Sequence, residues 1–199
     1  MLKGINASDG VGIGVARVAV EPDLTFTPYV PADAGIEKTR YANAVAKFIE
    51  QTNVQIERMT KTMGAETAAI MQAHIDFAED EGIKEMIIGS IESGMCAEQA
   101  LVDAYDMYYN MFSSMDDELF RERAADVADV KTGLLADLLG KEVINLSVLP
   151  ENSVVVVHEL TPSMTADMDR EHIVAIVTET GGSCPKCGGK GQVVFTQQS

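Results

Sequence analysis

The middle of this chain, residues 36–138, has helical periodicity, whereas the segments on both sides of it are patterned like β-strands. Within this block, apolar residues recur every three or four positions in successive stripes, with breaks at Gly64, residues 93–94 and Gly140. Short connections between amphipathic helices favour antiparallel neighbours. The pattern therefore predicts a bundle of four helices, over residues 36–63, 66–91 (interrupted at 79–82), 101–112 and 127–138.

The flanking segments predict an α/β domain that the bundle interrupts. Residues 143–146, 153–157 and 172–178 are short apolar runs typical of buried strands, and residues 160–163 form a turn that can open a brief helix. Residues 2–20 predict a strand-loop-strand, in which tight bends explain the glycines better than a phosphate cradle does, because the spacing is not GxGxxG. The expected fold class is α/β plus all-α. The α/β domain would occupy residues 1–20 and 143–183, and the helical domain residues 33–141.

Net charge and cysteine usage limit the partners and the location that we expect. The formal net charge is −16, which argues against nucleic acid and anionic membranes, because binding to either requires clusters of Lys and Arg. It suits a basic protein partner, or simply a soluble helical surface. No apolar run reaches the ~20 residues of a membrane span. The N-terminus lacks a signal segment and three cysteines make no disulfide framework, so we expect a cytoplasmic protein.

One helical segment allows both a structural and a binding interpretation. On a helix over residues 66–81, Ile70, His74 and Phe77 would be neighbours. They would form either a core stripe with one hydrogen-bonded histidine, or an exposed apolar face that docks another protein. Spacing alone favours the core stripe.

A second helical segment, residues 116–129, places acidic residues before arginines. This order is typical of ordinary helix-dipole and ion-pair support. As metal ligands, Asp117, Glu118 and Asp126 would have no supporting histidine in this segment.

The loop Thr178-Glu-Thr-Gly-Gly-Ser183 follows a predicted buried strand. Its paired glycines would let the backbone approach a bulky anionic group closely. The alternative is a plain hairpin turn.

In order and spacing, these motifs resemble the N-terminal region of enzyme I of the bacterial phosphoenolpyruvate-dependent sugar phosphotransferase system. The resemblance covers residues 2–183 and implies a swivelling phosphohistidine α/β domain that is interrupted by a four-helix domain. Its signatures are Gly-Ile-x-Ala-Ser-x-Gly at residues 4–10, Ala73-His74 with Glu79-Asp80-Glu81, Glu122-Arg-Ala-Ala-Asp-Val127, Leu160-Thr-Pro-Ser163 with Thr165-Ala166, and Thr178-Glu-Thr-Gly-Gly-Ser183.

In this family the helical domain docks the small phosphocarrier protein HPr, and a histidine of the α/β domain passes phosphate from phosphoenolpyruvate to HPr. HPr presents a cationic and apolar patch, which an acidic rim would steer. The full-length family uses magnesium and forms homodimers through a C-terminal domain that this chain lacks, so no cofactor is expected in the chain itself. The resemblance replaces the core interpretation of the His74 stripe with a docking face made of Glu66, Met71, His74, Phe77 and Arg123.

The chain departs from the family at the position of the phosphoacceptor. The family motif runs Gly-Gly-x-Thr-Ser-His, whereas here Gly181-Gly182-Ser183 precedes Cys184-Pro185-Lys186. Lys186 has no imidazole nitrogen, and its protonated amine is a poor nucleophile near neutral pH. The resemblance therefore implies a fragment that docks HPr but is inactive alone, with Thr165, Gly181 and Gly182 in supporting positions and without the phosphoenolpyruvate-binding domain.

Residues 184–199 resemble a different family. The segment Cys184-Pro-Lys-Cys-Gly-Gly-Lys-Gly191 is similar to one CxxCxGxG zinc-binding repeat of DnaJ-type co-chaperones. Cys184 and Cys187 supply two thiolates, whereas a structural zinc takes four ligands, so zinc closed within one chain is not expected. The alternative function is a zinc-linked interaction module shared between two chains. A phosphoacceptor at His158 or His172 is a third alternative, and their positions at predicted strand ends argue against it.

Overall fold

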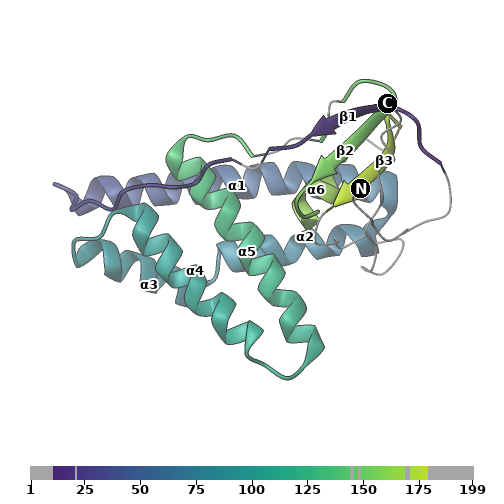
Figure 1. Cartoon of the computed structure of the whole chain (residues 1–199). Coiled ribbons are helices and arrows are strands. Elements are labelled where there is room, and N and C mark those ends of the chain that lie inside the picture. Colours follow the sequence, from purple (N-terminus) through teal and green to yellow (C-terminus); the bar gives the residue numbers. More distant parts are fainter. Residues whose placement is uncertain (1–10, 21, 144–145, 148, 169–170, 179–199) are drawn as a thin grey trace. The chain divides into compact units, whose positions relative to one another are not determined.

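The computed structural model describes residues 11–20, 22–143, 146–147, 149–168 and 171–178, and the chain divides into two units. One unit, Pro22–Val143, is helical. The other joins the N-terminal segment to the chain from Ile144 onward and contains a small sheet. The expected combination of an all-α part and an α/β part is confirmed (Figure 1).

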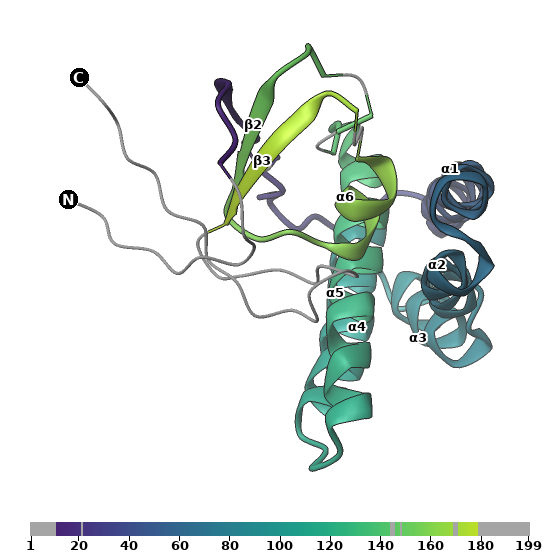
Figure 2. The ribbon, with the colours of Figure 1, turned by 90° about the vertical axis from the view of Figure 1, so that its right-hand side faces the viewer.

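The helical unit contains α1 (Ala34–Met63), α2 (Ala65–Ala78), α3 (Glu81–Glu92), α4 (Ala97–Ser113) and α5 (Glu118–Leu139). Helix α2 folds back along α1, and α4 and α5 form a long hairpin (Figures 1 and 2). Within the described residues, no helix is long and apolar enough to cross a membrane.

The predicted second helix is two helices, α2 and α3. Asp80 separates them, because its carboxylate accepts a hydrogen bond from the backbone N–H of Ile83 at 2.9 Å and so caps the start of α3. Gly64, with φ of 93°, makes the turn between α1 and α2, where a side chain would be strained. The interruption predicted at residues 79–82 is therefore a boundary between two helices.

The core of the helical unit consists of the stripes that the periodicity predicted. Fully buried aliphatic side chains contribute on the order of 1.5–3 kcal/mol each. The buried members include Tyr41 and Phe48 on α1, Ile83, Ile87 and Ile91 on α3, Leu101 and Tyr105 on α4, and Val127, Val130 and Leu134 on α5.

The second unit contains a parallel sheet of order β1-β2-β3, formed by β1 (Val15–Val18), β2 (Ser153–Val157) and β3 (Ile173–Thr178). The predicted short helix is present as α6 (Pro162–Asp167), which follows β2 and precedes β3 in the chain (Figure 2). Parallel neighbours need such a crossover. Buried Leu146, Val155, Val157 and Leu160 form the core of this unit, with side chains of α6 packed against them.

The described residues cover only part of two segments in which strands were predicted. Val143 and Leu146, the two ends of the strand predicted for residues 143–146, lie in no strand, and residues 144–145 fall outside the described residues. Leu146 is 2% exposed and belongs to the core of this unit, whereas Val143 is 47% exposed. Of the strand-loop-strand predicted for residues 2–20, β1 is present, and the first strand falls in residues 1–10, outside the described residues.

Candidate functional site

Helix α2 turns one face into the helical unit. Met71 is 1% exposed and His74 is 0% exposed, because α2 packs against both α1 and α5. Their side chains do not reach the surface, so the prediction that Met71 and His74 belong to an exposed docking face is wrong. Glu66 lies on α2, and its side chain falls outside the part that the structure describes.

Three phenylalanines from three helices form an aromatic cluster at the end of the α4–α5 hairpin. The rings of Phe77 on α2 and Phe112 on α4 meet edge to face, with centroids 5.8 Å apart and planes at 78°. Phe112 in turn stacks on Phe120 of α5, at 6.2 Å and 13°. Phe77 and Phe112 are half-buried and Phe120 is 42% exposed, so the cluster presents aromatic surface to solvent. We call Phe77, Phe112 and Phe120 the aromatic platform.

Arg123 lies beside the aromatic platform. It follows Phe120 by three positions on α5, a spacing that places two side chains on the same face of a helix. Its side chain is 45% exposed and pairs with Asp126, with Nη1 3.3 Å from Oδ2. The resemblance to the enzyme I family predicts Phe77 and Arg123 in the docking face, but not Phe112 and Phe120. The sequence signal that could have found Phe120 is its spacing, because it lies three positions before Arg123 and so shares a helix face with it.

Acidic side chains are exposed on the segments that carry the platform and on the start of α3. They are Asp76 and Glu79 near the end of α2, Glu81 on α3, and Asp116 and Asp117 in the α4–α5 turn. Among the described residues, these segments combine an apolar centre, the Arg123 guanidinium and exposed carboxylates, which matches the composition of protein-binding surfaces.

Behind Arg123 lies a buried group of ionisable side chains. Nε2 of His74 is 3.5 Å from Oδ1 of Asp126 and 3.9 Å from Oδ2 of Asp129. The side chain of Asp126 is 11% exposed and that of Asp129 is 7% exposed. Neither imidazole nitrogen has a hydrogen-bond partner within the described residues. The fold thus brings His74 of α2 beside Asp126, whereas the sequence of α5 itself has no histidine there. The described residues nevertheless include no group of three or more His, Cys, Asp or Glu that could hold a metal ion.

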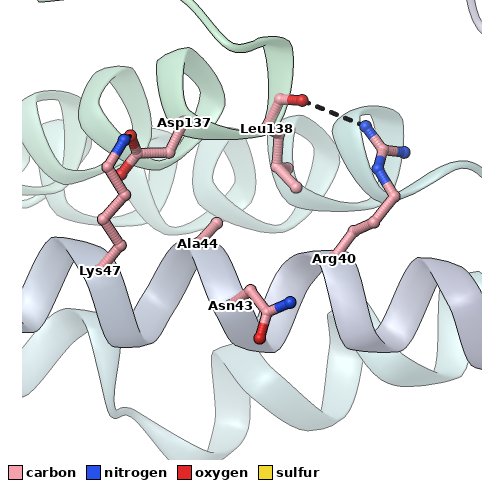
Figure 3. Close-up of a pocket in the computed structure, with 6 residues that line it drawn as sticks. All are labelled: Arg40, Asn43, Ala44, Lys47, Asp137 and Leu138. Atoms are coloured by element: carbon pink, nitrogen blue, oxygen red, sulfur yellow. Dashed lines mark hydrogen bonds and ion pairs between the residues drawn. The ribbon is translucent and has the colours of Figure 1, made fainter.

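A shallow pocket of about 240 Å³ lies between α1 and α5 (Figure 3). Its two cations are already paired, since Lys47 meets Asp137 across it and Arg40 donates to the carbonyl oxygen of Leu138 at 3.1 Å. Arg40 also pairs with Glu37 at 2.8 Å. The contacts to Asp137 and Leu138 join α1 to α5, and the pairing of both cations leaves no anion-binding site among the described residues that line this pocket.

The predicted supporting residue Thr165 is 5% exposed on α6, and its hydroxyl donates to the carbonyl oxygen of Thr161 at 3.0 Å. His158 follows β2 and His172 precedes β3, at the strand ends where they were predicted. Gly181, Gly182, Lys186, Cys184 and Cys187 lie outside the described residues.

Known proteins share both units of this chain. The model of the PEP-utilising enzyme N-terminal domain matches residues 3–123, and the model of the PEP-utilising enzyme mobile domain matches residues 149–184. Phosphoenolpyruvate-protein phosphotransferase of Enterococcus faecalis is 40% identical over 92% of this chain and 32% of its own length. The Staphylococcus carnosus protein of the same name is 39% identical over 91% of this chain and 32% of its own length. The chain therefore spans about a third of these relatives.

Solved structures give the same result. The solution structure of Enzyme I (nEIt) has a TM-score of 0.80 and 31% identity, covering 90% of this chain and 74% of that one. The N-terminal domain of Enzyme 1 - Nitrogen shares the fold, with a TM-score of 0.63 and 21% identity. Because sequence and structure agree over most of the chain, it belongs to the enzyme I family of PEP-utilising enzymes and corresponds to the N-terminal region of that family.

Proposed function

We propose that this chain is the N-terminal part of a phosphoenolpyruvate-protein phosphotransferase and that its helical unit docks HPr on the aromatic platform and Arg123. The observation that carries the proposal is the exposed, stacked Phe120 beside an exposed arginine. Aromatic and arginine side chains supply most binding hot spots, because they bury large areas with few rotatable bonds. Family membership supplies the identity of the partner, a carrier with a cationic and apolar patch.

Charge supports the same partner. The chain has a net charge of −16, and acidic residues are exposed on the segments that carry the platform. Opposite charges accelerate encounter more than they strengthen the complex, and salt screens them over roughly 10 Å at 0.1 M ionic strength. We therefore expect the association rate with HPr to fall steeply with added salt, while the dissociation rate changes little.

The chain alone would dock HPr without transferring phosphate. The family places its phosphoacceptor histidine where this sequence has Lys186. Incubation with labelled phosphoenolpyruvate and the phosphoenolpyruvate-binding part of a relative should then leave no acid-labile label on this chain. As a partner of HPr, the chain would act in the cytoplasm.

The direct test is titration of the full chain with Enterococcus faecalis HPr, by calorimetry and by NMR. We expect saturable binding, with shifts concentrated on α2 and on the α4–α5 hairpin. Phe120→Ala should weaken binding about tenfold or more, because truncation of an aromatic hot spot loses on the order of 2 kcal/mol.

Met107→Ala is the matched control. Met107 is also exposed, at 48%, but it precedes Phe112 by five positions on α4 and so points about 140° away around the helix. This variant should bind HPr as the unmodified chain does. Absence of HPr binding by the folded chain, or equal losses in both variants, would reject the docking proposal.

A further inference from the structure

The carboxylate of Asp126 lies between a buried imidazole and an exposed guanidinium. Its Oδ1 faces Nε2 of His74 at 3.5 Å, and its Oδ2 faces Nη1 of Arg123 at 3.3 Å. His74 is fully buried, the Asp126 side chain is 11% exposed, and the Arg123 side chain is 45% exposed. The three residues thus form a line from the interior of the helical unit to the surface beside the aromatic platform.

We propose that His74 and Asp126 are positioning residues for Arg123, which hold its guanidinium in place for a protein partner without touching that partner. The proposal rests on the proposed function for the identity of the partner, HPr. The arrangement of Arg123 itself can be tested without any partner.

The burial of Asp126 allows it to hold Arg123 in place. An exposed pair of Arg and Asp three positions apart fixes little, because both side chains lose rotamer freedom when they meet. Here Asp126 is already held by its packing in the interior, so only Arg123 has freedom left to lose. A guanidinium anchored in advance loses less entropy when a partner binds.

The imidazole of His74, at the buried end of this row of three residues, faces two carboxylates. Asp126 and Asp129 both approach Nε2, and a lone pair on Nε2 would repel them. We therefore expect the proton of the imidazole ring on Nε2, the nitrogen that faces these carboxylates. This predicts a spectroscopic signature, namely Nε2–H and not an Nδ1–H tautomer for His74, in long-range ¹H–¹⁵N spectra of the imidazole.

The first experiment measures Arg123 without HPr. We expect ¹⁵N relaxation of Arg123 Nε to report an ordered side chain in the unmodified chain and a mobile one in Asp126→Asn and His74→Leu. In His74→Gln an amide N–H can face Asp126 in place of the imidazole N–H, so Arg123 should stay ordered. Equal mobility of Arg123 in all four proteins, or an Nδ1–H tautomer, would overturn the proposal.

The second experiment is a binding cycle with Enterococcus faecalis HPr. Arg123→Ala should weaken binding about tenfold, and Asp126→Asn about three- to tenfold. Adding Asp126→Asn to Arg123→Ala should change affinity less than about twofold, because residues that act through one another are not additive. Full additivity would show that Asp126 does not act through Arg123.

Asp137→Asn is the matched control, since Asp137 is also on α5, is 9% exposed and pairs with a cation, Lys47. It lies eleven positions after Asp126, about 16 Å along the helix, and should leave HPr affinity and Arg123 order unchanged. If the unmodified chain fails to bind HPr while Arg123 is ordered through Asp126, the proposed function fails and the positioning of Arg123 stands.

Discussion

Glu37 is the residue whose removal should destabilise the helical unit most clearly for its size. It lies in the first turn of α1 and is 4% exposed. Its Oε2 accepts from the backbone N–H of Ala97 at 2.8 Å and from Arg40 at 2.8 Å, and its Oε1 accepts from Tyr29 at 2.9 Å. The N-cap of α4, Cys96, makes no side-chain capping bond. Glu37 therefore caps α4 from a helix that is distant in the sequence.

The loss of stability expected for Glu37→Ala follows from these contacts. Removal of a helix cap lowers the free energy of unfolding by about 1 kcal/mol. Removal of one partner from a buried ion pair is worth about 3–5 kcal/mol, but the Arg40 side chain is 32% exposed and keeps its pair with Glu98. We therefore expect a loss of about 2–3 kcal/mol in the free energy of unfolding. For a unit of this size, that corresponds to a drop of roughly 6–12 °C in Tm.

Thermal unfolding followed by far-ultraviolet circular dichroism would measure this loss. Glu37→Gln keeps an acceptor for Ala97 and should lose about half as much. Glu92→Ala is the control, because the Glu92–Lys38 pair is exposed, at 58% and 37%, and should matter by less than about 0.5 kcal/mol. If Glu37→Ala unfolded at the same temperature as Glu92→Ala, the argument that Glu37 caps α4 would be refuted.

Three further predictions follow from single contacts. Burial acts to raise the pKa of Glu37, but hydrogen bonds from Ala97, Tyr29 and Arg40 outweigh it and the pKa lies below the ordinary 4.5. The stabilisation should therefore be present above pH 4.5 and fade as the pH falls further, so the Tm gap between Glu37→Gln and the unmodified chain should close in acid. Gly133→Ala would bring a Cβ to 2.6 Å from the Phe48 ring, so despite better helix propensity it should lose about 1–2 kcal/mol by chemical denaturation. Asp80→Ala removes the cap of α3 and should lose about 1 kcal/mol in the same assay, with Asp80→Asn close to unchanged.

The core of the helical unit could be predicted from the sequence because burial on a helix repeats with the helix. The stripe that includes Tyr41, Phe48, Thr52 and Met59 is buried as its spacing indicates. The break at Asp80 falls within the interruption predicted at residues 79–82, whereas α5 begins at Glu118, nine positions before the start predicted at residue 127. Periodicity therefore located the helices better than their ends.

Candidate binding residues were harder to predict because spacing shows which side chains share a face, and not which face a neighbouring helix covers. Met71 and His74 were assigned to a surface, and α1 and α5 cover them. Phe120 owes its exposure and its stacking on Phe112 to the path of the α4–α5 turn. The approach of His74 to Asp126 joins two helices far apart in the chain, and no local pattern reports it.

The packing of α2 on α5 links the stability of the helical unit to its proposed binding surface. Phe77 follows His74 by one turn of α2, and Arg123 precedes Asp126 by one turn of α5. A shift of α2 along the α4–α5 hairpin would separate His74 from Asp126 on α5 and move Phe77 away from Phe112 on α4. The same register thus fixes the buried contact and the exposed aromatic edge. A substitution that loosened the α2–α5 contact should therefore weaken docking even where no altered atom reaches the surface.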